Sequence, residues 1–234
     1  MRLRTVNLAS ALAITALIAA GCSNTRPNEP APAAEAVQRP APAPPAPADD
    51  RPVIAAFGDS LTAGYGVAAG LSYPDYLQKE IDAHGYRYRV VNQGISGDTT
   101  SGGVSRIEEA IRLDPEIVIL ELGGNDGLRG LPLETTRQNL SEMAARLQAG
   151  GAKVLLAGMT LPRNYGPDYI RGFERLYTDL ARQRRIPLIP FLLEGVATRP
   201  ALMQGDAIHP TAEGNRIVAA TVFKHLQPLL RKSS

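Results

Sequence analysis

The fold class is indicated most directly by the segment Val53-Ile54-Ala55-Ala56-Phe57-Gly58-Asp59-Ser60. Its first five residues are all apolar, which is the pattern of a strand buried on both faces. Four similar apolar runs follow, and longer amphipathic stretches separate them. Strands are expected at 53–57, 88–91, 117–122, 154–159 and 187–190, and helices at 73–83, 101–112, 133–149, 169–185 and 212–230.

This alternation predicts an α/β protein with a parallel sheet covered on both faces. Right-handed crossovers between the five strands then give a three-layer α/β/α sandwich. Ligands in such folds bind at the carboxyl ends of the strands, so the loops that follow the strands should carry the chemistry.

The chain before residue 53 has a different character. Residues 1–21 hold two of the 25 basic residues and none of the 23 acidic ones, so the remaining chain is formally neutral. An apolar run of about 13 residues, 8–20, is too short to span a bilayer comfortably but suits a signal peptide. It ends in Ala20-Gly21-Cys22, which resembles a bacterial lipoprotein signal, cut before a cysteine that then carries lipid. The alternative is an ordinary secretory signal with Cys22 as a bystander.

The segment Ser23–Pro52 contains nine prolines and eight alanines in 30 residues, with no aromatic side chain. It cannot bury enough surface to offset chain entropy, so it should form an extended, disordered tether. We therefore expect three parts: a lipoprotein signal peptide at 1–21, lipidated Cys22 with a tether to residue 52, and one domain at 53–234.

Composition excludes several classes of protein. The single cysteine and three histidines exclude an internal disulfide and disfavour a zinc site. A net charge of +2 and the absence of tryptophan argue against nucleic acid as a partner.

Four of the loops that follow strands hold an unusual group. Gly58-Asp59-Ser60 follows the first strand; no Walker lysine follows it, and Thr62 stands where a nucleophile elbow needs glycine. Gly94 follows the second strand, Asn125 the third, and the spacing Asp206-Ala207-Ile208-His209 precedes the last helix. Each motif alone is more often a turn or a helix cap. Together they supply a hydroxyl, a backbone N–H, an amide and an Asp/His pair, which are the parts that acyl transfer needs.

These blocks resemble the SGNH (GDSL) hydrolase family at Gly58 to Leu61, at Gly94, at Gly123 to Asp126 and at Asp206 to His209. The segments 96–99, 121–130 and 161–166 are most similar to the bacterial thioesterase I, lysophospholipase and arylesterase group. The resemblance covers residues 53 to about 228, and it implies a flavodoxin-like fold.

The resemblance also implies roles. Ser60 would be the nucleophile, His209 the general base and Asp206 its orienting acid. The oxyanion hole would consist of the N–H groups of Ser60 and Gly94 and the amide of Asn125. No metal or cofactor is implied. We expect Asp59 and Asp126 to fix loop geometry, and Ser96 is a weak rival nucleophile.

The implied activity is that of a serine esterase acting on lysophospholipids, aryl or acyl esters, or acyl thioesters. The regions 128–133 and 161–169, with Arg129 and Arg163, should border an apolar acyl groove. Two alternatives remain: an O-acetyl esterase for envelope polysaccharide, and a lipid-anchored binding module without turnover. We expect a monomer in the cell envelope, held to the membrane through Cys22. Because serine follows Cys22, the outer membrane is favoured in a Gram-negative host.

Overall fold

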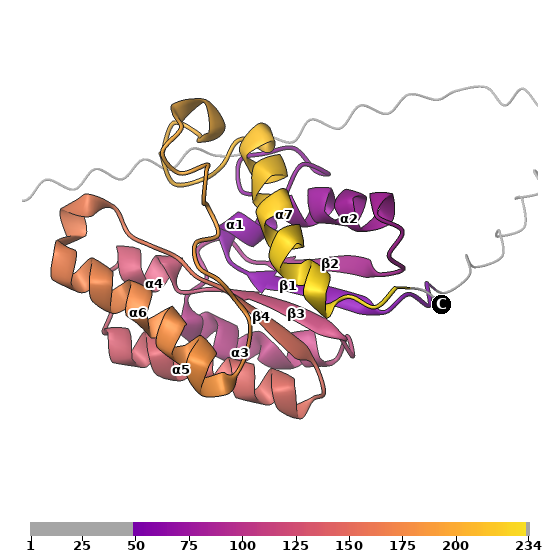
Figure 1. Cartoon of the computed structure of the whole chain (residues 1–234). Coiled ribbons are helices and arrows are strands. Elements are labelled where there is room, and N and C mark those ends of the chain that lie inside the picture. The colour runs from indigo at the N-terminus through magenta and orange to yellow at the C-terminus, as the bar shows by residue number, and fades with distance from the viewer. Residues whose placement is uncertain (1–48, 233–234) are drawn as a thin grey trace, which may run out of the picture. The chain divides into compact units, whose positions relative to one another are not determined.

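The computed structural model describes residues 49–232. The signal peptide, Cys22 and the tether up to residue 48 lie outside the described residues, so their assignments stay predictions. Five strands form a parallel sheet in the order β2-β1-β3-β4-β5 (Figure 1). They are β1 (Val53–Gly58), β2 (Arg89–Gly94), β3 (Ile117–Glu121), β4 (Lys153–Ala157) and β5 (Leu188–Ile189). The predicted five-stranded parallel sheet is therefore confirmed.

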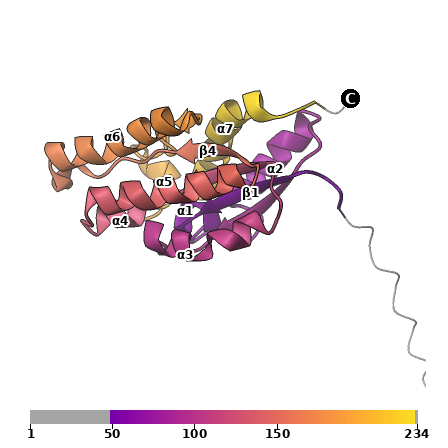
Figure 2. The same cartoon turned by 90° about the horizontal axis from the view of Figure 1, so that it is seen from below.

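Helices cover both faces of the sheet, as Figures 1 and 2 show. On one face α2 (Tyr73–Ala83) packs against α7 (Ala212–Leu226). On the other face α5 (Leu133–Ala149) lies between α3 (Thr100–Ile111) and α6 (Pro167–Arg184). This is the three-layer sandwich that the sequence predicts. None of the helices in the described part of the chain is long and apolar enough to cross a membrane.

The centre of the sheet is fully buried. All six residues of β1 and all five of β3 are buried, which explains why these strands are apolar in sequence apart from Glu121 at the end of β3. The register pairs Gly58 with Gly94 on one side and with Glu121 on the other. The ends of β1, β2 and β3 therefore meet at the same height, and the loops that leave them converge.

The element ends differ from the sequence prediction in ways that sterics explain. The last helix ends at Leu226 and continues as a 3₁₀ turn at Gln227–Leu229, because Pro228 has no N–H to donate. Two short helices, α1 (Ser60–Ala63) and α4 (Gly124–Leu128), lie in segments that the sequence assigns to loops. Each begins two or three residues after the end of a strand, and both carry functional candidates.

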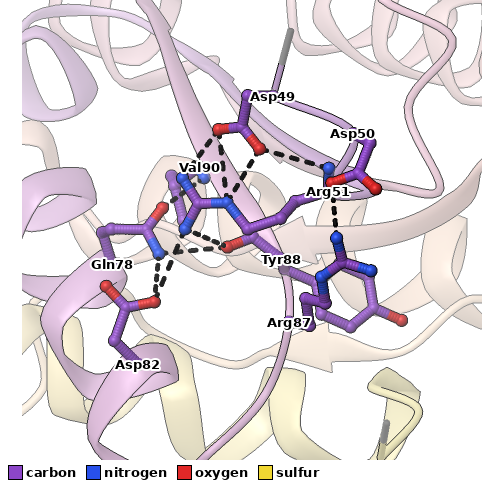
Figure 3. A network of polar contacts seen from close by, with 8 residues as sticks. All are labelled: Asp49, Asp50, Arg51, Gln78, Asp82, Arg87, Tyr88 and Val90. Atoms are coloured by element: carbon purple, nitrogen blue, oxygen red, sulfur yellow. Dashed lines mark hydrogen bonds and ion pairs between the residues drawn. The ribbon is translucent and has the colours of Figure 1, made fainter. Parts of the chain in front are cut away.

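The amino edge of the sheet holds a polar network (Figure 3). Arg51 bonds to Asp49 and donates Nη1–H to the carbonyl oxygen of Tyr88 at 3.3 Å, while Arg87 pairs with Asp50 at 2.5 Å. Asp50 and Arg51 therefore contact residues of the domain, although the sequence analysis placed them in the tether. The proline and alanine content of the segment does not reveal these contacts, because they are made by the acidic and basic residues at its end.

Candidate active site

Ser60 is the first residue of α1, directly after the buried strand β1. The Asp59 side chain caps this helix by accepting the N–H of Leu61 at 3.0 Å. The helix ends after one turn at Gly64, whose φ of 77° suits glycine. The sharp strand-to-helix turn leaves the Ser60 hydroxyl beside the carboxyl edge of the sheet.

Three side chains from two distant segments form a hydrogen-bonded chain. The Nε2 atom of His209 lies 2.8 Å from the Oγ atom of Ser60. The Nδ1 atom of His209 lies 2.6 Å from Oδ2 of Asp206. A base within hydrogen-bond reach of a hydroxyl, itself oriented by a carboxylate, is the arrangement of a serine nucleophile triad. The structure thus brings together Ser60, His209 and Asp206 as the sequence analysis expects.

The loop before α7 holds Asp206 in place. Its other oxygen, Oδ1, accepts the backbone N–H groups of Ile208 at 2.9 Å and His209 at 3.0 Å. Burial opposes the charged form of Asp206, but these bonds and the bond from the His209 ring outweigh it and lower the pKa of Asp206 to about 2. Asp206 is therefore an anion at neutral pH and stabilises a positive charge on His209.

Tyr65 packs on the imidazole of His209, with the ring centroids 4.6 Å apart. Tyr65, Ile95 and Ile208 are the large apolar side chains that are most exposed in the described part of the chain. Tyr65 and Ile208 line the cavity that contains Ser60, so the mouth of the site is apolar.

Asn125, in α4, also lines this cavity. Its amide nitrogen donates to Oδ2 of Asp59 at 3.1 Å and to the carbonyl oxygen of Asp98 at 2.8 Å. Asp59 is thus a positioning residue for the loop, as expected. Asp126 fills a similar role, because it accepts the N–H and the hydroxyl of Thr100.

Gly94 does not take the place that the sequence analysis gave it. Its N–H donates to Oδ1 of Asn92 at 2.9 Å, and Gly94 is absent from the lining of the cavity that holds Ser60. A Cβ atom at Gly94 would collide with the backbone of Thr62 and Ala63, so this glycine allows α1 to pack against β2. Strand β2 extends to Gly94, which uses its N–H for local structure.

Gly97, three residues further on, is the glycine that lines the cavity. Among the described residues its N–H has no hydrogen-bond acceptor, whereas its carbonyl oxygen accepts Nη2–H of Arg129 at 3.0 Å. Its φ of 81° turns the backbone in a way that favours glycine. The sequence analysis named only Gly94, and Gly97 was missed because hydrogen bonds, which the sequence does not show, distinguish the two glycines. Ser96 also lines the cavity, but none of the described side chains that could act as a base bonds to it.

The loop that carries Gly97 is pinned by a buried ion pair. The Nε atom of Arg106 lies 2.7 Å from Asp98, and both side chains are about nine-tenths buried. The same guanidinium donates to the carbonyl oxygens of Gln93 and Gly58. Arg106 therefore ties the loop after β2 to the end of β1, a role that nothing in the sequence pattern indicated.

Two adjoining cavities open at this edge. One, of about 190 Å³, lies over Ser60 and is lined by Gly97, Asn125 and His209 among others. The second, of about 470 Å³, shares Gly124, Leu128, Met159 and Ile208 with the first. Its other walls are mostly apolar: Leu161, Pro162, Ile170, Phe191, Leu193, Ala197 and Met203. Arg163 also lines it. Within residues 49–232 no cluster of three or more His, Cys, Asp or Glu side chains could hold a metal ion.

A parallel α/β sandwich with a Ser-His-Asp triad at its carboxyl edge defines the molecule as a serine hydrolase. Residues 56–217 match the model of the GDSL-like Lipase/Acylhydrolase family, and the chain belongs to that family.

Its relatives include Esterase TesA of Pseudomonas aeruginosa, which is 45% identical over 174 residues, covering 74% of this chain and 87% of the relative. Another is Thioesterase 1/protease 1/lysophospholipase L1 of Escherichia coli (strain K12), which is 39% identical and covers 76% of this chain and 85% of the relative. A crystal structure of TesA matches with a TM-score of 0.74 and 44% identity, over 76% of this chain and 99% of that one.

Proposed function

We propose that the protein hydrolyses acyl esters through Ser60, His209 and Asp206, with an acyl-enzyme intermediate. The observation that carries this assignment is the continuous chain from Asp206 through His209 to the Ser60 hydroxyl, at 2.6 and 2.8 Å. The esterase names of the relatives support the same reaction class.

In the first step the Ser60 oxygen attacks the ester carbonyl carbon while Nε2 of His209 takes the hydroxyl proton. The carbonyl π electrons move to oxygen, which becomes an oxyanion. When the intermediate collapses, the bond to the leaving alcohol or thiol breaks and His209 gives it the proton. Water then repeats the sequence on the acyl-enzyme, releasing the carboxylic acid and the free Ser60 hydroxyl.

The oxyanion hole that we propose differs from the one expected from sequence. Its donors are the N–H of Ser60, which has no acceptor among the described residues, the N–H of Gly97, and the amide of Asn125. Asn125 would share its amide between the oxyanion and its present acceptors. Losing one such donor typically costs about 2.7–4 kcal/mol of transition-state stabilisation.

Labelling with a fluorophosphonate, followed by mass spectrometry, tests the nucleophile. The label should attach to Ser60, and Ser60→Ala should lose both the label and the hydrolysis of a p-nitrophenyl ester. Ser96→Ala, which removes the neighbouring hydroxyl, is the matched control and should keep both. An active protein labelled elsewhere would disprove the assignment.

The apolar second cavity favours acyl chains longer than acetyl as substrates. Each buried methylene contributes about 0.8 kcal/mol to binding, so a chain that fills this cavity gains over a short one. An O-acetyl esterase for polysaccharide would leave the 470 Å³ cavity empty. A panel of esters from acetyl to palmitoyl tests this, and a preference for acetyl alone would contradict it.

We further propose that the domain is exported and anchored in the cell envelope through lipidated Cys22, with the outer membrane favoured in a Gram-negative host. Support comes from the sequence Ala20-Gly21-Cys22 after an apolar run. Cells fed a labelled fatty acid should label the wild-type chain but not Cys22→Ala, and Ser23→Ala is the matched control. Equal incorporation of the labelled fatty acid into Cys22→Ala and Ser23→Ala would refute the proposal.

A further inference from the structure

A carboxyl group lies buried under the nucleophile and has no part in the triad. Glu121 is the last residue of β3, in a strand that is otherwise apolar, and its side chain is fully inaccessible to solvent. A carboxyl at such a position is costly unless its charge is removed or paired. None of the ion pairs among the described residues involves Glu121, so its cost has to be offset in another way.

The contacts of Glu121 are to both ends of the nucleophile turn. Its Oε2 atom accepts the N–H of Asp59 at 3.2 Å and the hydroxyl of Thr62 at 2.8 Å. Asp59 directly precedes Ser60, and Thr62 follows it by two residues. The hydroxyl of Tyr73 lies 3.2 Å from Thr62 Oγ1 and completes this chain from the side of α2.

The absence of a side chain at Gly58 leaves room for the contact between Glu121 and Thr62. A Cβ atom at position 58 would collide with the Thr62 hydroxyl and with the Glu121 carboxyl group. The glycine of the Gly58-Asp59-Ser60 sequence therefore permits Glu121 to reach beneath the turn.

Two buried acids share this region, and their contacts distinguish their charge states. Asp59 has an N–H donor on each oxygen, from Leu61 and from Asn125, which favours its anion. Glu121 Oε1 has no partner among the described residues, which an anion tolerates far less than a neutral acid does. Burial raises the pKa of Asp59 to about 6, and burial together with the Asp59 charge raises the pKa of Glu121 well above its ordinary value.

The titratable neighbours leave this assignment in place. Tyr73 on α2 and Tyr177 on α6 are fully buried, and burial raises the pKa of each well above its ordinary value, so both are neutral. Arg106 on α3 is committed to Asp98 and to two carbonyl oxygens. Around Asp59, the charge of His209 lowers the pKa of the Asp59 carboxyl and the charge of Asp98 raises it.

We propose that Glu121 is a positioning residue that, as a neutral acid, ties together both ends of the Ser60 turn, while Asp59 carries the single negative charge of the pair. Through Asp59 the same arrangement orients the amide of Asn125. Only the expected change in kcat rests on the proposed ester hydrolysis; the charge state of Glu121 does not depend on it.

Infrared difference spectroscopy tests the charge state without any substrate. At about pH 8, where exposed carboxyls are ionised, the wild-type protein should show the carbonyl stretch of a protonated carboxyl group. The band should disappear in Glu121→Gln and persist in Asp59→Asn. Absence of the band in the wild type, or its loss only in Asp59→Asn, would overturn the proposal.

Kinetics test the positioning role. The value of kcat is calculated per active site, with the number of active sites determined by fluorophosphonate titration. Glutamine keeps a carbonyl acceptor, so Glu121→Gln should stay within about threefold of the wild-type kcat. Glu121→Leu removes the acceptor and should lower kcat by about tenfold to a hundredfold with KM nearly unchanged, because a small displacement of the nucleophile has effects of that size. Wild-type kcat in Glu121→Leu, or equal losses in both variants, would refute the proposal.

If Glu121→Leu does not fold, Thr62→Val removes the hydroxyl donor with little change in shape, and it should lower kcat by about threefold or more. An unchanged kcat in that variant would count against the role. Failure of the proposed function would look different, because the wild type would then take no label at Ser60 while the infrared band would remain.

Discussion

Replacing Asp206 by asparagine isolates the charge that faces the imidazole. Asparagine can keep its carbonyl oxygen on the N–H groups of Ile208 and His209, at 2.9 and 3.0 Å in the native protein, so the loop should retain its shape. Its NH₂ group then faces Nδ1 of His209 in place of an anion. This favours the tautomer with the proton on Nε2, which cannot accept the proton of Ser60.

The magnitude follows from the geometry. Two unit charges about 4 Å apart interact by about 1 kcal/mol in water and about 4 kcal/mol at an effective dielectric constant near 20. The pair lies between these limits, because the Asp206 side chain is 38% exposed and that of His209 14%. Losing about 2–3 kcal/mol lowers kcat by about 30- to 150-fold, and the wrong tautomer adds to the loss.

The assay is the hydrolysis of a p-nitrophenyl ester, with kcat and KM measured separately and unfolding followed by circular dichroism. Asp206→Asn should lose about a hundredfold or more in kcat at nearly constant KM and with little change in melting temperature. Asp179→Asn, which alters an exposed aspartate paired with Arg182, is the matched control and should behave as wild type. A variant at position 206 that keeps more than a third of the wild-type kcat would refute the reasoning.

Asn125→Ala should lower kcat by about a hundredfold or more at constant KM if its amide binds the oxyanion, and a loss below tenfold in steady-state assays would contradict this. Gly94→Ala should lower the melting temperature, because its Cβ meets the backbone of α1; unchanged thermal unfolding would be inconsistent with the packing seen here. Ala197→Phe should reduce kcat/KM for long acyl esters by about fourfold for each methylene it excludes, and leave acetyl esters nearly unaffected in the same panel. The folded-state pKa of Glu121 is raised above its unfolded value, so the folded protein binds the extra proton and Glu121 destabilises it as pH rises. Between about pH 5 and 6, Glu121→Gln should therefore become more stable relative to the wild type, by about 1.4 kcal/mol of unfolding free energy per pH unit. Denaturant titration at several pH values measures this difference. A difference that stays constant with pH would mean that Glu121 titrates normally.

The layer architecture follows from the sequence because β1 and, up to Glu121, β3 are apolar runs, and such runs need cover on both faces. The triad can be predicted from the sequence for a related reason. Ser60 lies just after a strand, and the Asp206–His209 spacing lies just before the last helix. Parallel topology brings those chain positions to one edge. The resemblance to the SGNH family implies the roles of nucleophile, base and acid, and the parallel topology explains why the three residues meet.

The glycine that we propose for the oxyanion hole could not be predicted in the same way. Gly94 and Gly97 are three residues apart, and both occur beside turn-forming residues. The choice depends on the Asn92 side chain, which takes the N–H of Gly94, and on the length of β2. Neither is visible in a hydrophobic pattern, since both are set by how the edge strand packs against α1.

Glu121 shows a second limit. The apolar run that predicts β3 includes this charged residue, and its presence there is a signal that something inside the protein requires it. Its partners come from residues 59 and 62 through side-chain and backbone contacts that span about 60 positions. Sequence periodicity can mark such a residue as unusual but does not identify its partners.

Tyr88, at the amino edge of the sheet, binds residues from both ends of the described chain. Its carbonyl oxygen accepts from Arg51, and its hydroxyl oxygen accepts the backbone N–H of Arg231. Ends held this close suit circular permutation. A short linker from residue 232 to residue 49, with new termini opened at the exposed turn around Gly151, should give a rearranged chain that folds with the catalytic edge intact.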